Sequence, residues 1–312
     1  MEVFINNGTR SHVTWLYSGS SFVTPQNMQE MITGIHHVTA ISSNAQTNVD
    51  LYAGVLGLRL VKRTINFDAP DVHHLYYGDE EGTPGSIMTF FPYPGSTKGR
   101  KGKGQLTVTM FSIPEGSLDY WMQRLERFNV PFKQPQQRYG DEVFISFEDR
   151  DGLCLELVVS STDERKGNHL GPVPPEYSIR GFFGVKLSQD SMERTAGLLT
   201  EHLGHKAIKE ATDRFRFSTT GKPGTIVDII CDPREMRGLG GNGTVHHLAF
   251  ATPGEESQLA MRERLLELDL QVTTVMDRQY FRSIYFREPG GVLFEIATEP
   301  PGFAIDEPLD SL

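Results

Sequence analysis

A repeated order of elements constrains the fold of this chain more than any other feature. From Gly34 onward, a strand-like run, an amphipathic helix and three further strand-like runs follow one another, and this order recurs. Phe147 and Glu156 in the second copy have the same spacing as Phe286 and Glu295 in the fourth, with an acidic, glycine-containing turn between them. This match favours internal duplication. The sequence therefore predicts an α+β chain of four βαβββ modules, here named A to D.

The modules fall into two halves along the chain. We expect modules A and B within residues 31–160, a linker with three prolines at 161–180, and modules C and D within 181–312. Residues 1–30 are polar, rich in Ser, Asn and Gly, and have no sustained hydrophobic period. They predict a flexible N-terminal extension.

Composition excludes several classes of protein. The net charge is -10, and the Lys/Arg cluster at 98–103 is interleaved with glycine, so no nucleic-acid partner is expected. The two cysteines, Cys154 and Cys231, lie in apolar runs and offer no disulfide framework, which favours a reducing, cytoplasmic location. No apolar run approaches the ~20 residues that span a bilayer, and no signal-peptide pattern is seen. The sequence leaves a monomer and a homodimer open.

Two histidine doublets and one glutamate are the strongest chemical motif. His36-His37 opens module A, His246-His247 opens module D, and Glu295 lies on a late strand of module D. Two imidazoles and one carboxylate form the facial triad that suits non-haem Fe(II), with positions left open for substrate and dioxygen. The sequence thus predicts an iron centre, with Mn(II) as the alternative metal.

The chain carries His37-Val38 at the start of a strand, Leu56-Gly57-Leu58 after a helix, and Gly291 four residues before Glu295. This pattern resembles the vicinal oxygen chelate superfamily, which includes glyoxalases, bleomycin-resistance proteins and extradiol dioxygenases. Longer motifs are Ile35-His-His-Val-Thr39, Leu58-Arg-Leu-Val-Lys62, Asn66-Phe-Asp68, His74-Leu-Tyr-Tyr-Gly-Asp79 and Pro301-Gly-Phe303. These are similar to the bacillary ring-cleaving dioxygenases associated with hydroquinone and catechol degradation. The resemblance implies that pairs of modules curl into cups that hold metal and substrate. We therefore expect two cup-shaped pseudo-barrels.

Pairing of the modules decides whether the triad can assemble. If A pairs with B and C with D, each cup holds a single histidine at the expected ligand position. If A pairs with D and B with C, one cup holds His37, His247 and Glu295 together. The second arrangement is our prediction, and it departs from familiar extradiol dioxygenases because Gly184 stands where module C would carry a histidine.

Alternation of side chains along each first strand predicts which doublet member faces the hollow. His37 and His247 should face inward, and His36 and His246 should face the other way. The resemblance also implies that Thr89 stands where a glyoxalase-type isomerase carries a fourth ligand, so three protein ligands would leave room for a bidentate catecholate and O2.

Two residues are candidates for the chemistry beside the metal. Tyr285 precedes Glu295 at the spacing where, by the resemblance, extradiol enzymes place a substrate-contacting tyrosine. His74 is the candidate acid or base, since a histidine titrates near operating pH. The usual extradiol base is missing, because that region reads Ile230-Cys-Asp-Pro233.

The sequence and the resemblance together predict an Fe(II)-dependent, extradiol-type ring-cleaving dioxygenase. Its partners would be O2 and a small aromatic diol, a catechol or a hydroquinone, in aromatic degradation or quinone detoxification. Two alternatives stay open: a metal-dependent, glyoxalase-like isomerase or lyase, and a metal-free protein that binds aromatic ligands.

Overall fold

The computed structural model describes residues 31–312. The predicted extension at 1–30 lies outside the described residues. In the first half, module A comprises β1 (Gly34–Ser42), α1 (Ala45–Val49), the π-helical η1 (Asp50–Val55), β2 (Arg59–Asn66), β3 (Ala69–Gly78) and β4 (Ile87–Pro92). Module B comprises β5 (Gln105–Pro114), α2 (Leu118–Arg127), β6 (Phe132–Arg138), β7 (Glu142–Glu148) and β8 (Cys154–Ser160).

The second half repeats this order. Module C comprises β9 (Phe182–Ser188), α3 (Glu193–Gly197), the π-helical η2 (Leu198–His202), β10 (Lys206–Ala211), β11 (Arg214–Ser218) and β12 (Ile226–Ile230). Module D comprises β13 (Thr244–Thr252), α4 (Glu255–Glu267), β14 (Met276–Asp277), β15 (Phe281–Arg287) and β16 (Leu293–Pro301), and two short 3-10 turns follow it (Phe303–Ile305 and Leu309–Ser311). Residues 161–180 contain no helix or strand. The predicted α+β fold of four βαβββ modules is confirmed.

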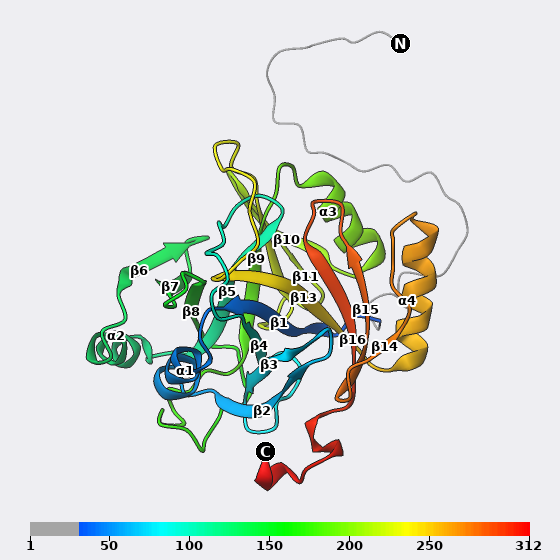
Figure 1. The fold of residues 1–312 in the computed structure, drawn as a ribbon. Coiled ribbons are helices and arrows are strands. Elements are labelled where there is room, and N and C mark those ends of the chain that lie inside the picture. The colour runs from blue at the N-terminus through cyan, green and yellow to red at the C-terminus, as the bar shows by residue number, and fades with distance from the viewer. Residues whose placement is uncertain (1–30) are drawn as a thin grey trace, which may run out of the picture.

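Hydrogen bonding joins the modules across the two halves of the chain. One eight-stranded sheet runs β14-β15-β16-β13-β1-β4-β3-β2, and the other runs β10-β11-β12-β9-β5-β8-β7-β6. Modules A and D therefore share one curled sheet, and B and C share the other, as the position of the histidines predicts. Figure 1 shows β1, in blue, beside β13, in yellow, near the centre of the molecule, with the helices at the outside.

The helices cover the outer faces of the sheets with their apolar sides. In α2, Trp121 and Leu125 are one helical turn apart and completely buried. Along β1, Val38 and Ala40 belong to this outer core, and both are completely buried. The residues that alternate with them, His37 and Thr39, face the hollow inside the cup. Strand β1 is buried on both faces because one face meets the core and the other meets the site.

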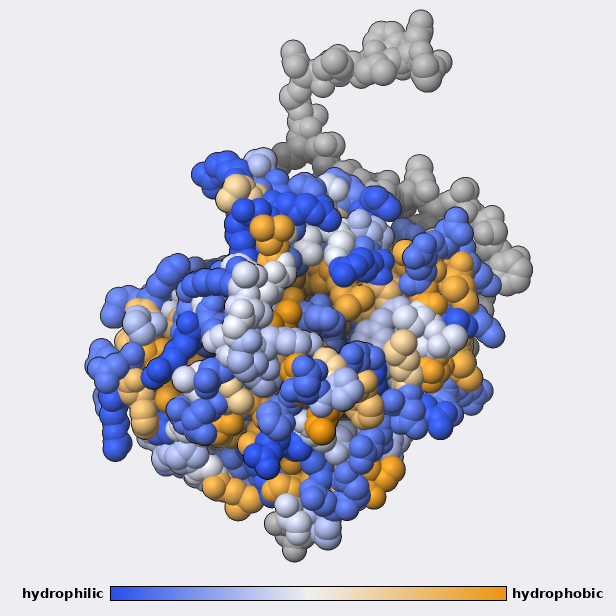
Figure 2. All heavy atoms as spheres, viewed as in Figure 1, coloured by the Kyte–Doolittle hydropathy of each residue, from blue (hydrophilic) through white to orange (hydrophobic). Residues whose placement is uncertain are grey.

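Figure 2 shows a face that is mostly hydrophilic, with apolar residues in separate small groups. Among residues 31–312, no helix is both long and apolar enough to cross a bilayer.

Candidate metal centre and substrate hollow

The three predicted metal ligands meet in the cup of modules A and D. His37 comes from β1, His247 from the neighbouring β13, and Glu295 from β16. His37 Nε2 and His247 Nε2 are 3.1 Å apart, and Glu295 Oε2 lies 3.2 Å from the first and 3.0 Å from the second. All three side chains are buried. The structure thus brings together two residues more than two hundred positions apart.

This spacing fits a metal ion. Two ligand atoms about 2.1 Å from an ion and at right angles to each other lie about 3.0 Å apart, as these atoms do. Ser283 donates a hydrogen bond to Glu295 Oε1, whereas Glu295 Oε2 is buried without a hydrogen-bond partner among the described residues. A buried carboxylate oxygen with no donor is costly unless a cation accompanies it. The three residues can therefore hold a divalent ion.

The charge state of Glu295 suits that role. Burial acts to raise its pKa, but His37 and His247 outweigh burial and hold the pKa well below the usual value. Burial also lowers the pKa of His247, despite the opposing influence of Glu295. A charged carboxylate beside a neutral imidazole is the protonation state that a metal requires of its ligands.

The first histidine of each doublet lies beside the second, and the prediction that these residues face away is wrong. His36 Nδ1 is 2.9 Å from His37 Nδ1, and His246 Nδ1 is 2.8 Å from His247 Nδ1. Each of these first histidines is an extra residue at a β-bulge between β1 and β13. Because a bulge breaks the two-residue alternation of side chains, both members of a doublet can lie on the same side of the strand.

His74 lies in the same hollow, held by two hydroxyl groups. Its Nε2 is 2.9 Å from Thr89 Oγ1, and its Nδ1 is 2.6 Å from the Tyr76 hydroxyl. Thr89 is in turn 2.8 Å from Thr39 Oγ1. Burial, with His37 and His247 nearby, lowers the pKa of His74 well below its usual value. The ring is therefore neutral at physiological pH and connects to a chain of hydroxyl groups.

Tyr285 lies opposite Glu295 in the pairing of β15 with β16. Its ring meets that of His247 edge-on, with centroids 5.7 Å apart. Burial, with Glu295 nearby, raises the pKa of Tyr285, so its hydroxyl keeps its proton and can donate a hydrogen bond.

Arg278 is a polar group of the hollow that sequence reasoning missed. Its Nε lies 3.3 Å from the Tyr285 hydroxyl, and its Nη2 pairs with Asp68 at 3.0 Å. Asp68 belongs to the turn between β2 and β3 in module A, so this contact spans two modules. A lone arginine in a short irregular segment gives no local signal of such a contact.

The hollow that these residues share is apolar enough to hold an aromatic ring. Its volume is about 400 Å³, within the range of small-molecule sites. Its walls include the side chains of Phe67, Tyr76, Phe91, Met276, Phe281 and Leu293. Aromatic walls with a few convergent polar groups favour a flat organic ligand.

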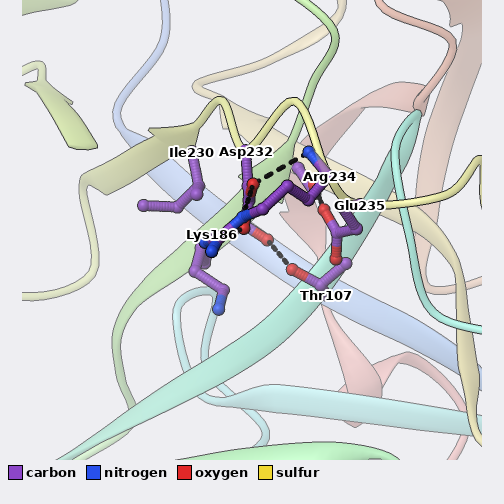
Figure 3. Close-up of a pocket in the computed structure, with 7 residues that line it drawn as sticks. Thr107, Lys186, Ile230, Asp232, Arg234 and Glu235 are labelled. Carbon is purple, nitrogen blue, oxygen red and sulfur yellow. Dashed lines mark hydrogen bonds and ion pairs between the residues drawn. The ribbon is translucent and has the colours of Figure 1, made fainter. Parts of the chain in front are cut away.

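The cup of modules B and C has a different character. A cavity of about 470 Å³ there is lined by Thr107, Lys186, Ser188, Ile230, Asp232, Arg234 and Glu235 (Figure 3). Strand pairing puts Gly184 at the position of His247, and a Cβ on Gly184 would lie 2.6 Å from the carbonyl oxygen of Ile226. Within residues 31–312, the only three-residue metal cluster is therefore in the A/D cup.

Carboxylates persist in the B/C cup but are paired with arginines. Pairing between strands aligns Glu156 with Thr89, and Asp228 with Glu295. Arg138 forms an ion pair with Glu156, and Arg216 forms one with Asp228. Guanidinium groups thus neutralise Glu156 and Asp228 in the B/C cup. At the same site the A/D cup has two histidines and a candidate metal position.

Comparisons with known proteins agree with this architecture. A family model described as "Glyoxalase/Bleomycin resistance protein/Dioxygenase superfamily" matches residues 34–157 and 182–296. The Bacillus subtilis protein named "Putative ring-cleaving dioxygenase MhqO" is 44% identical over 285 residues, which cover 91% of this chain and 90% of that protein. The "Chlorohydroquinone/hydroquinone 1,2-dioxygenase" of Sphingobium indicum is 33% identical over 296 residues, covering 91% of each. A crystal structure of a "putative dioxygenase" from Bacillus subtilis matches with a TM-score of 0.86 at 44% identity, covering 90% of each chain.

Proposed function

The chain belongs to the glyoxalase/bleomycin resistance protein/dioxygenase superfamily and to its ring-cleaving dioxygenases, and we propose that it is an Fe(II)-dependent, extradiol-type enzyme acting on a catechol or a hydroquinone. The single observation that carries the proposal is the triad of His37, His247 and Glu295 at an apolar hollow of about 400 Å³. Bound there, Fe(II) would supply Lewis acidity toward the substrate oxygens and a redox couple for O2.

Thr89 favours ring cleavage over isomerisation. It occupies the last-strand position of module A that corresponds to Glu295 in module D, and it carries no carboxylate. The protein thus contributes three ligand atoms rather than four, and the open positions suit a substrate and O2 together. Thr89 instead forms a hydrogen bond with Thr39 and one with His74.

Two residues of the hollow are assigned to substrate protons. Neutral His74, with its own proton on Nδ1 beside Tyr76, can accept a proton at Nε2 when Thr89 turns its hydroxyl toward Thr39. Tyr285 keeps its proton and would donate a hydrogen bond to a ring oxygen. Arg278 Nε donates a hydrogen bond to the Tyr285 hydroxyl oxygen, which restricts the direction in which that hydroxyl can donate its own proton. Tyr285 would thus orient the substrate ring, and His74 would accept the substrate proton.

The overall reaction balances without a further reductant. Cleavage between a hydroxylated ring carbon and its neighbour breaks one carbon–carbon bond, and both atoms of O2 enter the product. With hydroquinone, the hydroxylated carbon becomes a carboxylic acid and its neighbour an aldehyde. The four electrons that reduce O2 come from the ring itself.

Oxygen uptake tests this function directly. Protein purified without oxygen and loaded with Fe(II) should consume one O2 per molecule of 2-methylhydroquinone, hydroquinone or catechol, and mass spectrometry should show both oxygen atoms in a ring-opened product. Parallel loading with Mn(II) identifies the metal that supports turnover. Metal bound at one ion per chain with no uptake on any of these diols would refute the proposed dioxygenase and favour an isomerase or lyase.

Replacement of Tyr285 with phenylalanine should lower kcat/KM by about tenfold, because one hydrogen bond to the substrate, worth about 1.4 kcal/mol, is lost. Metal affinity should stay at the wild-type value, since Tyr285 is not a proposed ligand. Steady-state oxygen uptake and metal titration on the same preparation check both expectations. Unchanged kcat/KM would remove Tyr285 from the proposed mechanism.

A further inference from the structure

The cup of modules B and C contains a cavity to which the proposed ring cleavage assigns no role. Its volume is about 470 Å³, compared with about 400 Å³ for the hollow of the A/D cup. Sites for small organic ligands commonly have volumes of about 300–1,000 Å³. Figure 3 shows the side chains that line the cavity, from strands β5 and β9 and from the segment after β12. The cavity is therefore large enough for a small organic molecule.

Lys186 reaches this cavity from the inner face of β9. Its neighbours along the strand, Val185 and Leu187, are completely buried in the outer core. Successive side chains of a strand point to opposite faces, so Lys186 and Ser188 share the inner face, and both line the cavity. The Lys186 side chain is only partly buried, so a molecule in the cavity can contact it.

A comparison of the four modules shows that the fold does not require a lysine here. Strand pairing places Lys186 beside Asp228 in module C. The corresponding positions of modules D, A and B, each beside the residue aligned with Asp228, hold Ala249, Thr39 and Met110. Small, polar and apolar side chains all occur at this position, and module C alone has a charge there. The charge of Lys186 is therefore a specific feature of the B/C cup.

Within residues 31–312, the Lys186 amine forms no ion pair and no hydrogen bond, unlike the arginines of the same cup. Arg138, Arg214 and Arg216 all pair with carboxylates. Burial lowers the pKa of Lys186, with Glu156 acting in the opposite direction. A charged amine that loses water without gaining a partner costs free energy, and a bound anion would offset that cost. Lys186 is therefore the candidate anchor for an anion.

The other groups that line the cavity restrict the charge of a ligand. Asp232 is already paired with Arg234 at 2.9 Å. Lys186 thus matches a single negative charge, and the Glu235 carboxylate would repel an anion of higher charge such as phosphate. Ile230 adds an apolar surface that suits a hydrocarbon chain. Together these features fit an organic anion with one carboxylate.

We propose that the B/C cavity binds a small organic monocarboxylate, whose carboxylate group pairs with the Lys186 ammonium group. The Thr107 hydroxyl is a second donor to this ligand. It lies 3.5 Å from the Lys186 carbonyl oxygen, which is a weak hydrogen bond that a better acceptor can replace. The site is separate from the proposed metal centre, because the two cups are built from different sheets.

Sorbate is a suitable probe, because it has six carbons and one carboxylate, as the ring-opened product of hydroquinone would have. It should be titrated into the protein as purified, with 13C in the lysine side chains. The ε-methylene NMR signal of Lys186, assigned by its absence from Lys186→Met, should shift until the site is full. A signal that does not move would overturn the proposal.

Lys186→Met and Lys186→Arg form a matched pair of substitutions. Methionine keeps much of the apolar chain without the charge, whereas arginine keeps the charge. By saturation-transfer NMR of sorbate, Lys186→Met should bind about tenfold more weakly than the wild type, and Lys186→Arg within about threefold of it, since one hydrogen bond between charged groups is lost only in the first. Lys209→Met is the control, because Lys209 is exposed and pairs with Asp141. Thermal unfolding checks that every variant folds.

Equal sorbate affinity in Lys186→Met and the wild type would contradict the assignment, as would tighter binding of inorganic phosphate than of sorbate. Glu295→Gln separates this cavity from the metal centre. It should bind sorbate as the wild type does, since Glu295 lies in the A/D cup. Loss of sorbate binding in that variant would place the carboxylate at the metal instead. Failure of the proposed ring cleavage would leave all of these expectations unchanged.

Discussion

Replacement of Glu295 with glutamine should abolish stable metal binding and lower ring cleavage by about 10³-fold. The activity loss corresponds to about 4 kcal/mol, the scale on which a metal ion stabilises charge in a reacting substrate. Glu295 is completely buried and has one oxygen without a hydrogen-bond donor. In the metal-free protein, glutamine removes that buried charge and can still accept from Ser283.

The stability gained on metal addition separates this site from a structural one. A carboxylate retained only for packing should give the protein no stability on metal addition, whereas a metal ligand lets the bound ion stabilise the folded chain. Unfolding temperature with and without Mn(II), metal content per chain, and oxygen uptake should be measured on the same protein. We expect the wild type to gain stability on metal addition, and Glu295→Gln to gain none.

Glu156→Gln is the matched control. Glu156 occupies the corresponding last-strand position in module B but pairs with Arg138. Its replacement should leave metal content and oxygen uptake unchanged. Wild-type metal affinity in Glu295→Gln would show that the triad is not the metal site, and loss of metal in Glu156→Gln would point to the B/C cup instead.

The module order and the assembly of the triad could be predicted because both depend on long-range pattern. A duplicated βαβββ unit has few ways to form a closed cup, and only the pairing of A with D brings His37, His247 and Glu295 together. The prediction used positions of elements and residue types, which sequence records directly. The strand order confirms that pairing.

The local environment of the triad could not be predicted, because it depends on irregular geometry. The bulges at His36 and His246 reverse the side of the strand on which these residues lie, and no glycine or proline marks them. Arg278 reaches Tyr285 and Asp68 only because modules D and A meet at the same hollow. Contacts of this kind follow from the folded arrangement, not from spacing along the chain.

Replacement of Arg216 with methionine should destabilise the protein by about 3 kcal/mol, because two buried carboxylates, Asp228 and Glu142, would each lose one of their two arginine partners. Arg216 is 2% exposed, and Asp228 is completely buried. Arg216 Nε donates to Asp228 Oδ1 at 2.7 Å, and its Nη2 donates to Glu142 Oε1 at 3.0 Å. Urea unfolding at neutral pH should show the loss. Arg234→Met, in the exposed pair with Asp232, is the control and should cause no measurable change.

The pH dependence of that loss identifies its cause. Burial acts to raise the pKa of Asp228, but Arg216 and Arg214 outweigh it and hold the pKa below the ordinary value of 3.8. In the wild type, Asp228 therefore adds stability above pH 3.8, and this contribution is lost as the pH falls through the lower folded value. Without Arg216, burial should raise the pKa of Asp228. As the pH falls, Asp228 of the variant should therefore become protonated, which removes the cost of its buried charge. The difference in unfolding free energy should shrink toward pH 4, and Arg216→Met/Asp228→Asn should recover part of it at pH 7. A pH-independent difference would mean that lost packing, rather than weaker pairing of the Asp228 carboxylate, destabilises the variant.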